Sequence, residues 1–209
     1  MKNVFVYLIL VFTVSACGPK KKKSTGVSVG RTAAVVTQTQ VGSVNDKSGF
    51  CEKTFPSSGP DARSFKWPKL RPLPGAKAVA PPKMSGRWTW VNLWATWCEP
   101  CMDEMGLLKR WTASLDSEGR SIGLALLTID AIKDTAKLQA VIEAGLPGQV
   151  QWLYDPSLFD AFLEQLGVGR GAAIPIHALV DPDGLLRCVR VGAISALDFA
   201  AVKSIFQGG

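Results

Sequence analysis

The sequence predicts an α/β domain built on a central mixed β-sheet with helices on both faces. Between residues 88 and 166, short apolar runs rich in β-branched and aromatic residues alternate with segments of helical periodicity, as parallel strands joined by helices do. Near the C-terminus, the turn sequence Asp-Pro-Asp-Gly at 181–184 separates two further apolar runs, which predicts an antiparallel hairpin followed by a last helix. A stretch of roughly 125–160 residues is long enough to form one domain with its own core.

The predicted elements follow one another along the chain. Strands are expected at residues 88–94, 121–129, 150–154, 176–180 and 185–191. Helices are expected at residues 98–115, 135–143, 157–166 and 195–206, with Ser157 as the N-cap of the third helix and Gly167 as its end. Residues 85–209 are therefore expected to form the domain. Residues 51–84 form a lead-in that is irregular or at most edge strand, because seven of the thirteen prolines lie between residues 56 and 82.

Two cysteines, Cys98 and Cys101, stand where the first buried strand ends and a helix begins. The free N–H groups and the positive dipole end of a helix N-terminus stabilise a thiolate, so the pKa of the Cys98 thiol is expected in the range of roughly 3.5–7.5. Cys101 lies one turn later on the same face and can close a small disulfide ring with Cys98. Cys98 is therefore the expected attacking sulfur and Cys101 the resolving one.

Two other interpretations of this cysteine pair are weaker. A closed zinc site needs four Cys or His ligands, whereas the chain has one His and no second C-x-x-C motif. A purely structural disulfide is disfavoured because a bridge across so short a loop restrains the unfolded chain little. The pattern thus favours redox chemistry at the two sulfurs, with no metal site and no cofactor expected.

The segment 93–101, Leu-Trp-Ala-Thr-Trp-Cys-Glu-Pro-Cys, followed by Asp-Glu-Met at 103–105, resembles the active-site signature of the TlpA/ResA-like branch of the thioredoxin-fold proteins, which are extracytoplasmic thiol-disulfide oxidoreductases. Further matching segments occur in the family's order over roughly residues 85–207: Tyr154-Asp155-Pro156, Leu166-Gly167-Val168, Ile174-Pro175, residues 179–184 and Val191-Gly192. The resemblance implies a thioredoxin-like fold for residues 85–209, with a short hairpin in the lead-in before it.

The same resemblance implies roles for residues around the cysteines. Pro175 would be a cis-proline that faces Cys98 and Cys101, the backbone of its neighbour Ile174 would pair with the substrate chain, and Trp97 would touch substrate. In ResA-like proteins the glutamate equivalent to Glu104 is a buried acid that handles the proton of the second cysteine. The alternative for Glu104 is an exposed surface acid on the helix.

The family mostly reduces disulfides, for instance those of apocytochrome c, so the resemblance implies a protein-disulfide reductase. Its expected partners are protein thiols or disulfides and a membrane or periplasmic redox protein, and the chain is expected to be a monomer. A disulfide oxidant or isomerase would use the same residues. A copper-carrying metallochaperone is an alternative because His177 lies two residues after Pro175, although a packed strand residue is the simpler interpretation of His177. A non-catalytic lipoprotein with the same fold is a third possibility.

Residues 1–16 resemble a signal peptide, with Lys2 before an apolar core that is too short to span a membrane. The sequence Val-Ser-Ala-Cys at 14–17 resembles a bacterial lipobox, in which Cys17 is lipidated, whereas ordinary cleavage after Ala16 is the competing interpretation. Residues 17–50 are expected to form a lipid-anchored flexible tether. Gly18 after the cysteine favours the outer membrane by resemblance to lipoprotein sorting.

The net charge of +7 belongs almost entirely to the leader and tether. Residues 1–50 hold seven Lys or Arg and one acid, whereas residues 51–209 hold seventeen basic and sixteen acidic residues. The basic run 20–23 is either a solvated spacer or an electrostatic contact with anionic lipid headgroups. The nearly neutral domain lacks the basic face and the motifs of a nucleic-acid-binding protein.

Export also bears on the remaining cysteines. If Cys17 carries lipid, Cys51 and Cys188 are left beside the C-x-x-C pair, and an oxidising compartment permits a second disulfide between them. A structural Cys51–Cys188 bridge is therefore the hypothesis, with two unpaired thiols as the alternative.

Overall fold

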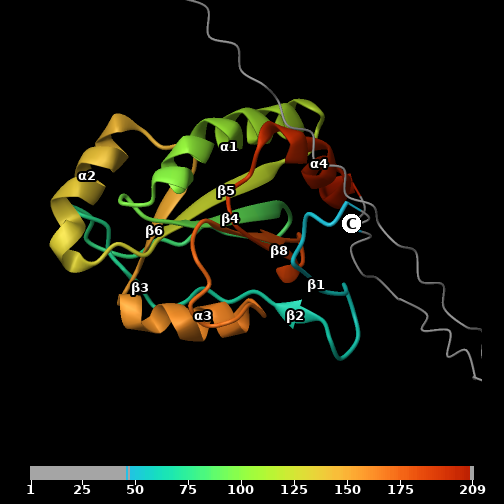
Figure 1. Ribbon diagram of the computed structural model, residues 1–209, viewed down its shortest axis with the longest axis horizontal. Coiled ribbons are helices and arrows are strands. Elements are labelled where there is room, and N and C mark those ends of the chain that lie inside the picture. Colours follow the sequence, from blue (N-terminus) through green and yellow to red (C-terminus); the bar gives the residue numbers. More distant parts are fainter. Residues whose placement is uncertain (1–45, 47, 208–209) are drawn as a thin grey trace, which may run out of the picture. The chain divides into compact units, whose positions relative to one another are not determined.

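An eight-stranded mixed sheet forms the centre of the domain in the computed structural model, which describes residues 46 and 48–207 (Figure 1). Its strands lie in the order β1-β8-β7-β4-β5-β6-β3, and β2 pairs with β8 beside this path. Three central strands run parallel to one another: β4 Trp88–Trp94, β5 Ile122–Thr128 and β6 Gln149–Leu153. The strand β7 Ile176–Val180 is antiparallel to β4, and β8 Leu185–Val191 is antiparallel to β7. The predicted mixed sheet and its C-terminal hairpin are confirmed.

Helices cover both faces of this sheet, as predicted (Figure 1). One face carries α1 Glu99–Ser117, α2 Thr135–Ala144 and α4 Phe199–Gln207, whose buried side chains share one apolar core. The other face carries α3 Phe159–Gln165, which packs with part of the lead-in in a second core. Because β4 lies between these two cores, all seven of its residues are buried.

The side chains of β4 alternate between the two cores. Trp90 and Trp94 point toward α1, whereas Val91 and Leu93 point toward the α3 face. Asn92 shares the α1 face and is fully buried although it is polar. A buried amide needs hydrogen-bond partners, and the partners of Asn92 belong to the candidate active site described below.

The lead-in contributes three two-residue strands to the edges of the sheet. They are β1 Lys53–Thr54 and β2 Arg63–Ser64, both paired with β8, and β3 Leu70–Arg71, paired with β6. The predicted short hairpin is therefore wrong, because β2 and β3 pair with strands at opposite sides of the sheet. Between them the chain packs Phe65 and Trp67 against the α3-side core, and the surrounding prolines keep each strand short.

The predicted N-cap of the third helix is also wrong. The N-cap of α3 itself is Leu158, whose side chain makes no capping hydrogen bond. Ser157 lies within a 3₁₀ turn whose N-cap is Asp155, and the Asp155 carboxylate accepts a hydrogen bond of 2.8 Å from the backbone N–H of Ser157. This bond lowers the pKa of the Asp155 carboxyl below its ordinary value. The 3₁₀ turn, Pro156–Leu158, precedes α3. Asp at the cap with Pro at the next position is a common helix start.

The structure joins Cys51 and Cys188 by a disulfide, with their Cα atoms 5.4 Å apart. Cys188 lies in β8 and is fully buried. The neighbouring Phe50 is also buried, and the guanidinium of Arg190 lies 4.8 Å from the centre of its ring. The start of the lead-in is therefore attached to β8 covalently as well as by packing.

The expected signal peptide, the lipidation site Cys17 and the basic run 20–23 lie outside the described residues, as does nearly all of the tether. Within the described part of the chain, none of the helices combines the length and the apolar character that crossing a bilayer requires.

Candidate active site

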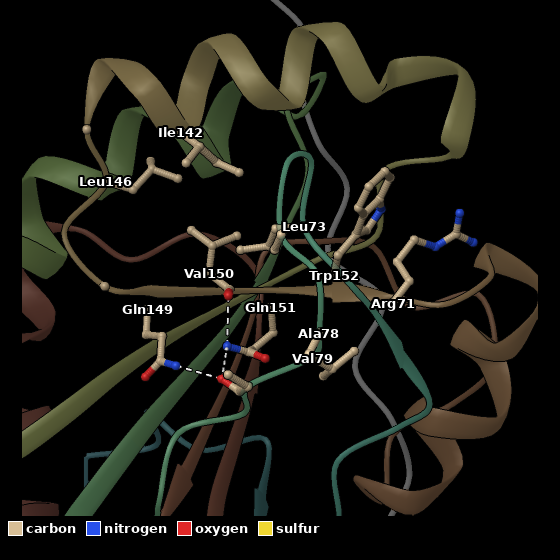
Figure 2. Close-up of a pocket in the computed structure, with 14 residues that line it drawn as sticks. Arg71, Leu73, Ala78, Val79, Ile142, Leu146, Gln149, Val150, Gln151 and Trp152 are labelled. Atoms are coloured by element: carbon tan, nitrogen blue, oxygen red, sulfur yellow. Dashed lines mark hydrogen bonds between the residues drawn. The ribbon is translucent and has the colours of Figure 1, made fainter.

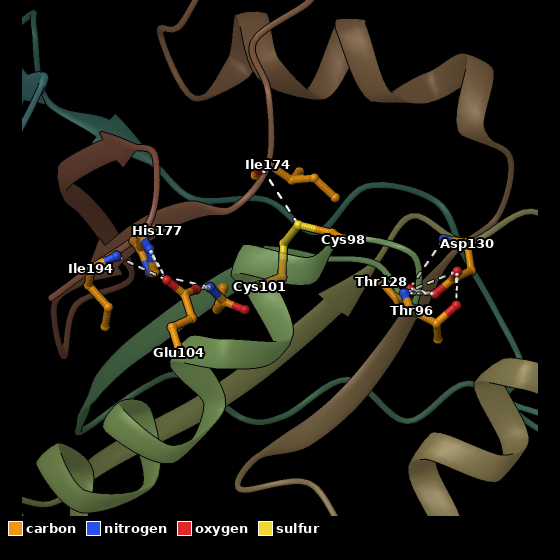
Figure 3. Close-up of a disulfide and its surroundings, with 10 residues drawn as sticks. Thr96, Cys98, Cys101, Glu104, Thr128, Asp130, Ile174, His177 and Ile194 are labelled. Atoms are coloured by element: carbon orange, nitrogen blue, oxygen red, sulfur yellow. Dashed lines mark hydrogen bonds and ion pairs between the residues drawn. A yellow bond between two sulfur atoms is a disulfide. The ribbon is translucent and has the colours of Figure 1, made fainter.

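Cys98 and Cys101 form a disulfide at the N-terminus of α1, with their Cα atoms 5.3 Å apart (Figure 3). Cys98 is the N-cap residue and is 5% exposed, whereas Cys101 lies in the first turn and is fully buried. The Cys98 side chain makes no capping hydrogen bond of its own, so the sulfur, once reduced, would face the free N–H groups at the start of the helix. Cys98 is thus the outer sulfur and Cys101 the inner one.

The turn that carries Cys98 is fixed by a buried carboxylate, Asp130. The backbone N–H of Thr96 donates to the Asp130 carboxylate at 3.0 Å, and the Thr96 hydroxyl donates to it at 2.8 Å (Figure 3). The Thr128 hydroxyl donates to the same carboxylate. The indole N–H of Trp152 donates to the Asp130 carbonyl oxygen at 2.7 Å. Sequence reasoning missed Asp130. The available signal was an acid two residues after the end of β5, at the same edge of the sheet as the cysteines.

Replacing Asp130 by Asn is expected to lower the free energy of unfolding by about 1–3 kcal/mol, because an amide N–H₂ would then face groups that donate to the carboxylate. The rate of disulfide exchange is expected to fall as well, since Thr96 positions the turn before Cys98. Urea unfolding and exchange kinetics of the variant measure the two effects. Asp134→Asn, on the 3₁₀ turn before α2, is the control. Equal stability of the Asp130 and Asp134 variants would contradict the positioning role.

The peptide bond between Ile174 and Pro175 is cis, as the family resemblance implies. It brings the carbonyl oxygen of Ile174 to 3.8 Å from Cys98 Sγ (Figure 3). The carbonyl of Pro175 accepts a hydrogen bond of 2.9 Å from the N–H of Gly192, which ties this loop to the end of β8. The backbone before Pro175 therefore lies beside Cys98 Sγ.

An apolar pocket of about 640 Å³ opens beside Cys98. Trp97, 56% exposed, lies at this pocket with Phe159 and Ile129, and the segment 171–174 completes it. Of the three residues expected to contact substrate, Trp97 and Ile174 line this pocket, whereas Pro175 does not. Cys98 lines it as well. Phe159 and Ile129 were not singled out from the sequence, because nothing local marks an apolar residue as pocket-lining rather than core.

Glu104 is buried, and the alternative of an exposed surface acid is wrong. Its Oε1 accepts a hydrogen bond of 2.8 Å from the Asn92 amide, and its Oε2 accepts one of 3.0 Å from the backbone N–H of Ile194 (Figure 3). Nε2 of His177 lies 3.5 Å from the same Oε2. Two N–H groups, from β4 and from the loop after β8, thus donate to one carboxylate, and a ring nitrogen of His177 in β7 lies near it, one helical turn after Cys101.

A second cavity, of about 460 Å³, lies between β6, the end of α2 and the lead-in, and shares no residue with the pocket beside Cys98 (Figure 2). Figure 2 shows the amides of Gln149 and Gln151 donating to the carbonyl oxygen of Ala80, which attaches the lead-in to β6. Arg71 is the titratable residue among those that line it. Across residues 46 and 48–207, no three His, Cys, Asp or Glu side chains are grouped so that they could hold a metal ion.

No protein-family model matches the chain. Its structure is similar to a thiol:disulfide interchange protein of the thioredoxin family from Chlorobium tepidum TLS, with 22% identity and a TM-score of 0.52 over 74% of this chain and 97% of that one. A DsbF homologue from Corynebacterium diphtheriae (19% identity, TM-score 0.44, 58% and 73% covered) and StoA from Bacillus subtilis (14%, 0.44, 64% and 95%) are also similar. At such identities the likeness concerns the fold. The chain has a thioredoxin-like fold, with a C-x-x-C disulfide at the N-terminus of α1.

Proposed function

We propose that this protein is an extracytoplasmic thiol-disulfide oxidoreductase that reduces disulfides in other proteins. The observation that carries the proposal is the position of the Cys98–Cys101 disulfide, with its outer sulfur at a helix N-terminus beside an apolar pocket and its inner sulfur buried. A structural bridge needs no apolar pocket beside one of its sulfurs.

The reaction consists of two exchanges of sulfur. In the reduced protein, the Cys98 thiolate attacks one sulfur of a partner disulfide, forms a mixed disulfide and releases the other partner sulfur as a thiolate that takes up a proton. Cys101 then loses its proton and attacks Cys98 Sγ. The Cys98–Cys101 bond closes, and the second partner sulfur leaves as a thiol. Two electrons have passed from the protein to the partner, so a redox partner must reduce the pair again.

The groups around the sulfurs fit these steps. The partner chain would lie along the backbone at Ile174, 3.8 Å from Cys98 Sγ, with its side chains in the pocket beside Trp97. Glu104 is the buried acid of α1, one helical turn after Cys101, and would accept the proton of Cys101. The geometry gives no support to copper transport through His177, because its ring nitrogens face Trp90, Asn92 and Glu104.

The proposed site of action is the periplasmic face of a bacterial membrane. The sequence of residues 1–17 supports export and lipidation at Cys17, and residues 17–50 would then be the tether that holds a monomeric domain away from the membrane. The two disulfides in the described residues fit an oxidising compartment. Protein disulfides would be the substrates, and a membrane or periplasmic redox protein the source of electrons.

The proposal is tested by trapping mixed disulfides in cells with the Cys101→Ala variant, which attacks but does not release its partner. We expect partner proteins linked through Cys98 that are freed by dithiothreitol. The Cys98→Ala/Cys101→Ala variant is the matched control and should capture none. Equal capture by both variants, or none by either, would count against the proposal. In cells that lack the protein, partners of a reductase accumulate in oxidised form, whereas partners of an oxidant accumulate in reduced form.

A further inference from the structure

His177, the only histidine of the chain, is fully buried in β7 and has a fixed hydrogen-bonding arrangement. The indole N–H of Trp90 lies 3.1 Å from its Nδ1, and the Asn92 amide nitrogen lies 3.3 Å from the same atom. An indole N–H only donates, so Nδ1 must be the accepting nitrogen. The proton of the neutral imidazole therefore lies on Nε2.

The Nε2–H of His177 lies near the carboxylate of Glu104. It makes no hydrogen bond within the usual limit among the described residues, but Glu104 Oε2 lies 3.5 Å away, and both side chains are at most 1% exposed. In a site closed to water, an N–H directed at a carboxylate stabilises the ionised acid. Trp90 thus fixes the tautomer of His177, and the tautomer directs a donor at Glu104.

We propose that His177 is a positioning residue for proton transfer: by holding its Nε2–H toward Glu104, it keeps the carboxylate ionised and ready to accept the proton of Cys101. The inference rests on the proposed function, because only a resolving cysteine needs such an acceptor. His177 does not touch the sulfurs in this account. It acts through Glu104, whose oxygens also accept from Asn92 and Ile194.

The pairing register of the sheet positions His177. His177 pairs directly with Asn92 of β4 on one side and with Arg190 of β8 on the other. Two further ionisable groups come from the neighbouring positions: Cys101, three residues before Glu104 in α1, and Arg190, which pairs with His177 across β7 and β8. The guanidinium of Arg190 donates to the carbonyl oxygens of Phe50 and Ala193. The ring of His177, in contrast, lies 3.5 Å from the Glu104 carboxylate.

Nitrogen NMR of the full chain tests the geometry first, since a single histidine gives a single imidazole signal set. At pH 8 we expect the Nε2–H tautomer. A predominant Nδ1–H tautomer would overturn the inference, because the ring would then direct no proton at Glu104. This measurement needs no substrate and no variant.

Two variants then test the consequence for the chemistry. In His177→Asn, the amide oxygen replaces Nδ1 and keeps an acceptor for Trp90, but the donor to Glu104 is lost. In His177→Gln, the amide N–H₂ replaces Nε2–H and keeps that donor. The readout is the rate at which Cys101 displaces glutathione from Cys98 after reaction with glutathione disulfide, followed by mass spectrometry from pH 5 to pH 9.

We expect the acid side of the pH–rate profile to move to higher pH in His177→Asn, because the Glu104 carboxylate loses a donor that stabilises its charged form. The rate at pH 6 should fall about 3- to 10-fold, while the rate at pH 9 stays within about twofold of the wild type. His177→Gln should keep the wild-type profile. An unchanged His177→Asn profile, or an equal shift in His177→Gln, would overturn the inference while the proposed function stands. Failure of the wild type to close its disulfide would instead overturn the proposed function, and this inference with it.

Discussion

Replacing Cys98 by serine is expected to lower the rate of protein-disulfide reduction on the order of 10³-fold or more, as removal of a covalent nucleophile does in other enzymes. A serine hydroxyl stays protonated at neutral pH even at a helix N-terminus, and an oxygen cannot form the mixed disulfide. The measurement is insulin reduction with dithiothreitol as electron donor, on protein whose fold is checked by thermal unfolding.

Cys101→Ser is the informative comparison for this prediction. It keeps the attacking sulfur and loses the resolving one, so it should react once with a small disulfide and then remain as the mixed disulfide. Retention of turnover in Cys98→Ser would show that another group attacks the substrate. Equal single-turnover reactivity of the two variants would contradict the assignment of Cys98 as the outer, attacking sulfur.

Removal of the second bridge by Cys51→Ala/Cys188→Ala is expected to have the largest effect on stability. The two cysteines are 137 residues apart, and a cross-link across so long a loop removes much entropy from the unfolded chain. The free energy of unfolding should fall by about 4–5 kcal/mol, and the melting temperature by about 10–20 °C for a domain of this size. Denaturant unfolding of the oxidised proteins measures it.

The Cys98→Ala/Cys101→Ala variant is the matched control, because it removes a bridge between residues only three apart. The same entropy relation gives about 2 kcal/mol for so short a loop. If the two double variants lost equal stability, the Cys51–Cys188 bridge would not act by restraining the long loop, and its assignment as the structural staple of the domain would be wrong.

The central strands and helices could be predicted from the sequence because their patterns are local. β4 reads as a continuous apolar run, and the predicted residues 88–94 coincide with it. The lead-in could not be predicted in the same way. β2 and β3 have partners, β8 and β6, that come more than eighty residues later in the chain, and two-residue strands among prolines carry no signal of which partner they choose.

The candidate site could likewise be predicted only where its residues belong to local motifs. Cys98, Cys101 and Pro175 follow from short motifs and from family resemblance. The surroundings of the two buried acids, Glu104 and Asp130, do not follow in this way, because distant segments form them. Trp90 and His177, near Glu104, are 87 residues apart, and Thr96 and Asp130 are 34 apart. From the sequence, His177 looked like a packed strand residue. The sheet register alone places it opposite Asn92 and near Glu104.

The rate of alkylation of reduced Cys98 by iodoacetamide, measured against pH, tests the central claim most directly. Cys101→Ala isolates the one reactive sulfur, with free glutathione as the reference thiol. The account predicts a thiolate that persists below about pH 7.5, and hence labelling at neutral pH that is faster than that of glutathione. Labelling no faster than that of glutathione, with an inflection at the ordinary cysteine pKa of about 8.5, would contradict it.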